Sequence, residues 1–130
     1  MSQARNSAIV LFAHGARDPS WAEPFHRMVE RLRQTQPATR VTLAFLECMD
    51  PPLESAIEQL VKEGAGYITV VPVFLARGGH LKEDLPKMVQ DIRQRHPSLR
   101  IHVSKAVGDS EELTSAIADW AFAQHAPPVN

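Results

Sequence analysis

Two histidines and one glutamate occupy positions that a parallel sheet would bring close together. His14, Glu47 and His80 each follow one of the three most apolar runs of the chain. Imidazole and carboxylate groups together suit a first-row divalent metal ion. If the three runs are adjacent parallel strands, their carboxyl ends meet at one edge, and the pattern predicts a metal site there. Without that convergence, the histidines are ordinary loop residues and the glutamate is a solvated surface carboxylate.

The elements that must position these side chains are four apolar runs alternating with helical patterns. We expect strands at the four apolar runs, Ala8–Ala13, Val41–Leu46, Tyr67–Leu75 and Arg100–Val103. We expect helices at about Pro19–Gln36, after the cap-and-proline start Asp50-Pro51-Pro52, at about Lys82–Arg95, and from a capping-box-like start at Asp109 with Glu112. The last helix is expected to turn its apolar positions inward: Leu113, Ile117, Trp120 and Ala121.

Strands separated by helices of this length imply right-handed crossovers and an all-parallel α/β sheet with helices on both faces. The natural order for four such units is the flavodoxin-like 2-1-3-4, which places the switch point between strands 1 and 3. Pro72 cannot donate a ladder hydrogen bond, so we expect regular pairing to end near it. We expect a single domain over residues 1–126 and a loose tail over 127–130.

Composition narrows the class of protein. The chain has 130 residues, of which 44% are hydrophobic and 22% charged, as in ordinary globular proteins. A net charge of -1 without a Lys/Arg-rich run argues against nucleic-acid binding. The single cysteine, Cys48, excludes an internal disulfide and a cysteine-based zinc site within one chain. The N-terminal residues lack the apolar core of a signal peptide, and no apolar stretch would cross a bilayer, so we expect a cytoplasmic protein without a membrane partner.

The loops beside the histidines hold candidates for binding an anionic ligand. Gly15 permits close backbone approach in the turn after the first strand, and Arg17 in that turn binds a carboxylate or faces water. Gly78 and Gly79 could present backbone N–H groups to anionic groups beside the second histidine. The motifs GxGxxG, GxxxxGK[ST] and GxSxG are absent from the sequence.

Three segments carry a family resemblance: FAHGARDPSW, FLECMDPPLESAI and VVPVFLARGGHLKEDLP. In this order, and over nearly the whole chain, they resemble the small CbiX-type sirohydrochlorin chelatases, the cobalt- or iron-inserting relatives of the class II chelatases. The combination of HG-x-RDP with P-x-FL-x-x-G-x-H-x-x-x-D-x-P is the specific part of the match. It includes Pro72, the residue that disturbs the third strand.

The resemblance implies a chelatase-type α/β fold and insertion of cobalt or iron into sirohydrochlorin, on the route to cobalamin or sirohaem. It implies metal-site histidines at His14 and His80, assisted by Glu47. The chain looks like the short form of the family, in which two subunits pair, so a homodimer is expected. No permanently bound cofactor is expected, because the divalent ion (Co²⁺, Fe²⁺ or Ni²⁺) is a substrate.

In the expected mechanism each histidine has two roles: it binds the metal ion and it accepts a pyrrole proton. Glu47 would complete the coordination or draw protons away. Arg17, Arg77 and Lys82 are candidates to meet the carboxylates of the tetrapyrrole. Two alternatives keep the same ligands: a non-catalytic metal or tetrapyrrole carrier, and a metal-dependent hydrolase with an open coordination position.

Overall fold

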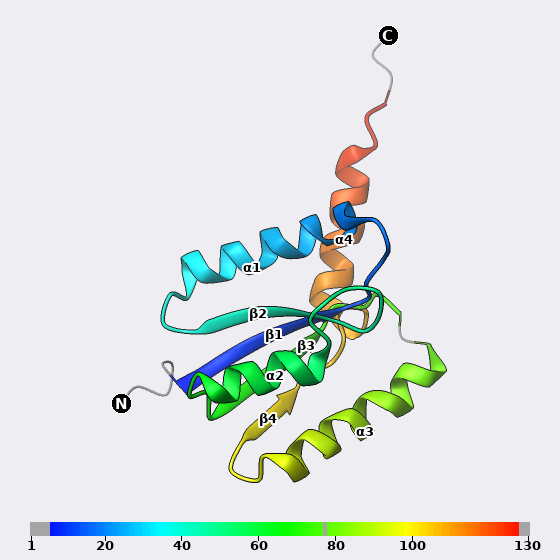
Figure 1. Ribbon diagram of the computed structural model, residues 1–130. Coiled ribbons are helices and arrows are strands. Elements are labelled where there is room, and N and C mark those ends of the chain that lie inside the picture. Colours follow the sequence, from blue (N-terminus) through cyan, green and yellow to red (C-terminus); the bar gives the residue numbers. More distant parts are fainter. Residues whose placement is uncertain (1–5, 77, 128–130) are drawn as a thin grey trace.

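The computed structural model describes residues 6–76 and 78–127, the side chains of residues 79 and 80 excepted. Strands and helices alternate along this part of the chain (Figure 1). The strands are β1 (Ser7–Ala13), β2 (Arg40–Phe45), β3 (Tyr67–Pro72) and β4 (Arg100–Val103). The helices are η2 (Pro19–Ala22), α1 (Glu23–Thr35), α2 (Leu53–Lys62), α3 (Gly79–Arg95), η3 (Val107–Asp109) and α4 (Glu111–Gln124), where η marks a 3-10 turn.

The sheet is parallel throughout, in the order β2-β1-β3-β4, which confirms the predicted order. The central strand β1 pairs with β2 as far as Ala13 and Phe45, and with β3 as far as Phe12 and Pro72. Pairing of β3 therefore ends at its proline, as predicted. Beyond it, Val73 N–H still donates to the Phe12 carbonyl at 2.7 Å, so the segment after β3 starts beside the end of β1.

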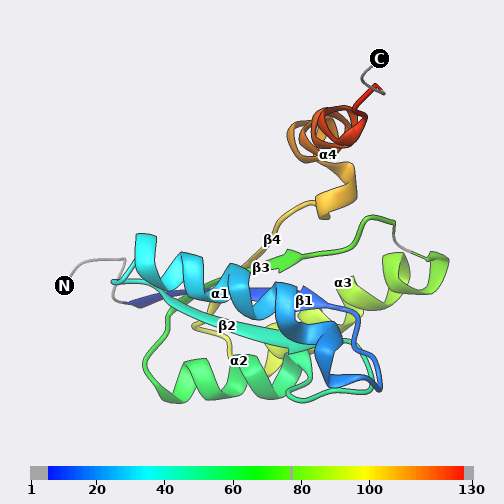
Figure 2. The same cartoon turned by 90° about the horizontal axis from the view of Figure 1, so that it is seen from above.

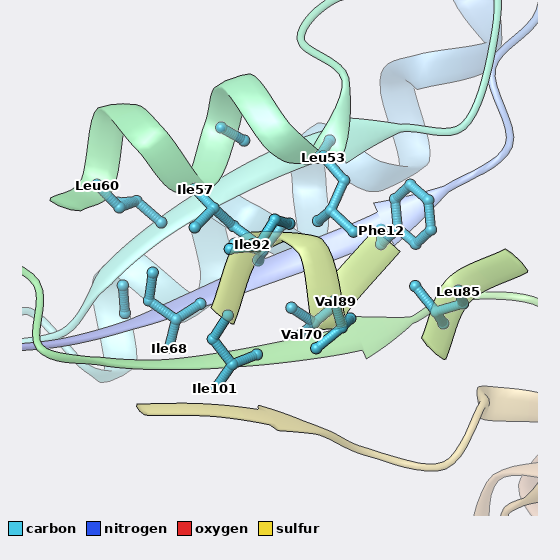
Figure 3. Close-up of a cluster of buried hydrophobic side chains, with 14 of the residues drawn as sticks. Phe12, Leu53, Ile57, Leu60, Ile68, Val70, Leu85, Val89, Ile92 and Ile101 are labelled. Carbon is cyan, nitrogen blue, oxygen red and sulfur yellow. The ribbon is translucent and has the colours of Figure 1, made fainter. Parts of the chain in front are cut away.

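One face of the sheet carries the larger core, beneath α2 and α3. Figure 3 shows the apolar side chains of these two helices meeting those of the strands. Phe12, Ile57 and Ile68 are among its fully buried members. Helix α2 contributes its face at positions 53, 57 and 60, as the spacing predicts. This core fixes β1 and β3 side by side, which is what the carboxyl edge requires.

The opposite face is covered by α1, whose Val29 packs with Leu11, Leu43 and Phe45. Helix α4 does not pack beside α1 on this face of the sheet. All fourteen residues of α4 are exposed, and in both Figure 1 and Figure 2 the helix reaches away from the sheet. The prediction that Leu113, Ile117, Trp120 and Ala121 face this chain's core is therefore wrong.

Several helix starts differ from the predicted ones, because the capping residue depends on where the chain turns. Helix α2 begins after Pro52, so Asp50 is not its cap. Helix α4 is capped by Ser110, whose hydroxyl accepts from Leu113 N–H at 3.3 Å, and Asp109 belongs to η3. Helix α3 begins at Gly79, three residues before the predicted start.

The expected tail lies, from residue 128 onward, outside the described residues. Among the helices that the structure describes, none combines the length and the apolar character needed to span a bilayer.

Removing part of the core beneath α2 should lower stability sharply. Ile57→Ala leaves a cavity at a fully buried position, and we expect it to cost about 2–5 kcal/mol of unfolding free energy. Ser55→Ala in the same helix changes an exposed side chain and should shift the unfolding free energy by less than about 0.5 kcal/mol. Urea unfolding followed by circular dichroism measures both. Equal losses in the two variants would contradict the assigned packing of α2.

Candidate functional site

His14 and Glu47 lie in contact at the carboxyl edge of the sheet. His14 is the first residue after β1, and its Nδ1 atom lies 3.1 Å from Oε1 of Glu47, two residues after β2. Their side chains are 46% and 44% exposed, so both are open to a ligand. The structure thus brings together two of the three residues that the sequence singles out.

The contact between His14 and Glu47 depends on the close approach of the Gly15 backbone to the Glu47 backbone. A Cβ built on Gly15 would lie 1.8 Å from the Glu47 carbonyl oxygen, so any other residue would clash with that backbone. The turn that follows is equally tight: Cys48 has φ 66°, and Met49 N–H donates to the Glu47 carbonyl at 2.8 Å. Glycine at position 15 is therefore required for the loops after β1 and β2 to touch.

Two aromatic residues hold His14 from other directions. The indole Nε1–H of Trp21 donates to the His14 carbonyl at 2.8 Å. The ring of buried Phe74 stands edge-on to the imidazole, with centroids 4.5 Å apart and an interplanar angle of 76°. Sequence reasoning missed both residues. They lie within the segments that carry the family resemblance, and this was the only signal that could have pointed to them.

The contact with Glu47 selects one form of the His14 ring. An ionised carboxylate only accepts hydrogen bonds, so a neutral imidazole must place its hydrogen on Nδ1. The lone pair is then on Nε2. Histidines that bind metal ions commonly donate their other ring N–H to a carboxylate in this way, which orients the ring and raises its basicity. The geometry suits His14 to metal binding through Nε2.

His80 lies in the first turn of α3, and its side chain is outside what the structure describes. The pairing of His14 with His80 therefore stays a prediction. Arg77 lies outside the described residues altogether. Within the described part of the chain, no group of three His, Cys, Asp or Glu side chains is placed to hold a metal ion.

The remaining predicted residues flank this edge. Gly78 precedes α3 and accepts from Leu81 N–H at 3.1 Å, while Lys82 is exposed in the same helical turn. Arg17 is exposed and lines a hollow of about 440 Å³ between the loops after β1 and β2. Asp18 caps η2: the backbone N–H of Ser20 donates to its side chain at 2.9 Å and lowers the pKa of its carboxyl group.

Comparison with known proteins gives consistent matches. The family model described as CbiX matches residues 8–122. A sirohydrochlorin ferrochelatase of Bacillus subtilis is 32% identical over 110 residues, which cover 85% of this chain and 42% of that protein. A sirohydrochlorin cobaltochelatase of Sulfolobus acidocaldarius is 26% identical over 113 residues, covering 87% of this chain and 88% of that protein. This chain thus spans less than half of the ferrochelatase but nearly all of the cobaltochelatase.

A solved structure agrees with the fold. It is the crystal structure of a putative cobalamin biosynthesis CbiX protein from Marinobacter aquaeolei VT8, with a TM-score of 0.79 and 30% sequence identity. The similarity covers 91% of this chain and 96% of that one. The fold of this chain is therefore shared over nearly the whole length of that relative.

A Cβ at position 15 should disturb the contact between the two loops. We expect Gly15→Ala to push the Glu47 carbonyl away and to lower the unfolding free energy by about 1–3 kcal/mol. Gly66→Ala is the matched control, because a Cβ there meets no described atom within 4 Å. Denaturant unfolding of both variants against the parent protein makes the comparison. Equal stability of the two variants would show that the close approach is not a constraint.

Proposed function

Because the chain belongs to the CbiX family, we propose that it inserts a divalent metal ion into the tetrapyrrole sirohydrochlorin. Relatives matched over most of this chain are named chelatases of that substrate, one for iron and one for cobalt. The observation that carries the proposal is the His14–Glu47 contact, which leaves the second nitrogen of an exposed imidazole free at the edge where α/β sheets bind ligands.

In the proposed mechanism the metal ion is a substrate held by Nε2 of His14 and by His80. When the ion passes to the macrocycle, two pyrrole N–H protons must leave the ring. Each histidine has then lost its metal bond, so the nitrogen that held the ion can accept one proton. Oε1 of Glu47, 3.1 Å from Nδ1, accepts the hydrogen bond of the ring while Nε2 takes up the proton.

This assigns Glu47 chiefly to His14 and only secondarily to the metal. Its Oε1 orients the ring, as carboxylates behind metal-binding histidines do. Its second carboxylate oxygen remains as a further metal ligand or as the next acceptor for a proton. Trp21 holds the same residue through the His14 carbonyl group, and Phe74 contacts the imidazole ring itself.

Substrate recognition in this proposal falls to the loops around the histidines. Arg17, Arg77 and Lys82 pair with the peripheral carboxylates of the tetrapyrrole, since charge-assisted bonds to carboxylates are strong and directional. Gly78 and Gly79 offer backbone N–H groups at the start of α3, where an anionic group is favoured. The hollow beside Arg17 leaves room for such a group.

A homodimer is part of the proposal. The chain covers 42% of the Bacillus ferrochelatase, so two copies supply about the length of that protein. Its similarity to shorter relatives over 88% and 96% of their lengths is consistent with a family form made of single-domain subunits. The physiological metal, cobalt or iron, decides whether the product serves cobalamin or sirohaem synthesis.

Turnover is the first test. The protein with sirohydrochlorin and Co²⁺ or Fe²⁺ should change the ring's absorbance faster than a mixture without protein. We expect His14→Ala to slow insertion about 100-fold or more, because it removes a metal ligand and a proton acceptor. His96→Ala is the matched control, since His96 ends α3 at the opposite edge of the sheet and should leave the rate unchanged.

The alternatives give different results in this assay. A carrier would bind the metal or the tetrapyrrole without raising the insertion rate above the control. A wild-type rate equal to the control would therefore overturn the chelatase assignment. Full activity in His14→Ala would instead overturn the site and leave the activity in place.

Two substitutions separate the roles of Glu47. Glutamine keeps an oxygen that can accept from Nδ1 of His14 but carries no charge, whereas alanine removes both acceptor and charge. We expect Glu47→Ala to lower Co²⁺ affinity and insertion rate by about 10–100-fold, and Glu47→Gln to retain most of the affinity. Calorimetric titration with Co²⁺ and the insertion assay measure the two effects. Equal loss of affinity in both variants would mean that the carboxylate itself binds the metal.

A further inference from the structure

A nine-residue segment occurs twice in the sequence, each time between a helix and an outer strand of the sheet. Residues 33–41 read RQTQPATRV and residues 93–101 read RQRHPSLRI. The two share Arg-Gln at the start, a proline in the middle, and an arginine followed by a β-branched residue at the end. The first segment joins α1 to β2 and the second joins α3 to β4, the outer strands of the sheet (Figure 1).

The two segments also fold alike. The residue before the proline has φ -133° and ψ 65° at Gln36, and φ -130° and ψ 72° at His96. The carbonyl groups of these two residues accept from Thr39 N–H and Leu99 N–H, each at 3.0 Å. A residue that precedes proline is disfavoured in helical conformation, so both helices end at this point. The repeated sequence therefore produces the same turn at both edges of the sheet.

The arginine at the start of each segment is bonded to the backbone of the outer strand. Nη2 of Arg33 donates to the Val41 carbonyl at 3.2 Å, and Nη2 of Arg93 donates to the Ile101 carbonyl at 2.8 Å. Both arginines lie in the last turn of a helix, where the helix dipole favours a positive charge. The same side chain thus reaches the equivalent backbone position of both outer strands.

These two carbonyl groups face away from the sheet. Along a strand, the backbone N–H and C=O groups of successive residues point alternately to the two sides. Leu46 N–H donates toward β1, so the backbone groups of Val41, an odd number of residues earlier, face outward. Arg100 N–H and Ser104 N–H donate toward β3, so the backbone groups of Ile101 also face outward. Both arginines therefore cover carbonyl groups on the open edges of the sheet.

An open strand edge is a template for pairing. The outward N–H and C=O groups of an outer strand can bond to an outer strand of another molecule, and unprotected edges aggregate for this reason. Space for a further strand is present at both edges: a hollow of about 390 Å³ lies along residues 39–42, and another of about 440 Å³ lies along residues 101–103. Arg33 lines the first hollow and Arg93 lines the second.

We propose that Arg33 and Arg93 protect the two edges of the sheet from strand pairing with a second copy of this chain. A second copy is the relevant molecule because it carries the same two outer strands. To pair, it must take the Val41 or Ile101 carbonyl from an arginine and enclose a guanidinium group that has lost its hydrogen bond. Losing a hydrogen bond to a charged group and enclosing that charge are both unfavourable.

Protection is needed at both edges. A pairing at one edge leaves the other edge of each copy open, so association through the strands would continue without closing. The repeat of the same arginine in both helix-to-strand segments meets this requirement. The proposal is independent of the chelatase activity, because its tests measure association and amide exchange rather than metal insertion.

Removing both guanidinium groups tests the protection. In the double variant Arg33→Met/Arg93→Met, the methionines keep flexible stems but lose the donors and the charge. We expect this variant, while circular dichroism shows it folded, to associate at least about 10-fold faster than the wild type in light scattering. Each single variant repeats the comparison with one edge unprotected. Scattering that grows no faster in these variants than in the wild type would overturn the proposal.

The control removes the same charge at other positions. Arg27→Met/Lys87→Met changes exposed side chains of the same two helices, α1 and α3, and lowers the net charge by the same amount. We expect it to associate as slowly as the wild type. Association as fast as that of the Arg33→Met/Arg93→Met variant would mean that net charge keeps the copies apart, and it would contradict the role of the edges.

Amide hydrogen exchange identifies how the double variant associates. The associated protein is exchanged, dissolved and read residue by residue by NMR. The N–H groups of Val41 and Leu43 in β2, and of Ile101 and Val103 in β4, face outward, so strand pairing should slow their exchange at least about 10-fold relative to the unassociated protein. Association of unfolded chains would instead speed the exchange of inner amides such as Val10 in β1. That result, or unchanged exchange at the outward amides, would contradict the proposal.

Discussion

The carboxyl edge of the sheet depends on the contact between the Gly15 backbone and the Glu47 carbonyl group. Strands β1 and β2 pair in parallel as far as Ala13 and Phe45, so their chains leave the sheet side by side. Parallel strands do not by themselves keep the following loops together. The missing side chain at position 15 lets the two backbones stay in contact beyond the strands, and this brings the His14 ring within 3.1 Å of the glutamate.

The strands, the helices between them and the parallel sheet could be predicted from the sequence, because these features follow from which residues are buried. The apolar runs predict strands, the helices between them require a parallel sheet, and the end of β3 at Pro72 follows from the missing N–H donor. The helix starts could not be predicted as well. Asp109 and Ser110 are both good capping residues, but Asp109 lies within η3, whereas Ser110 has the extended backbone that a helix cap adopts.

Part of the candidate site could likewise be predicted from the sequence, and part could not. Strand order alone predicts that the residues after β1 and β2 are neighbours, which is how sequence finds His14 and Glu47. The contacts of Trp21 and Phe74 with His14 depend on the path of two loops, and no periodicity encodes such a path. These contacts matter for the proposed role of His14, since a side chain held from three directions loses little conformational freedom when it binds a ligand.

Helix α4 shows what an apolar stripe does and does not indicate. The spacing of Leu113, Ile117 and Trp120 predicts a buried face, but all three side chains are exposed in the structure. The close approach of Gly108 to the Leu75 carbonyl group decides where the helix points. Because Phe74 accepts from Gly108 N–H and also contacts the His14 ring, the start of α4 and the proposed metal ligand are supported by one short stretch of backbone.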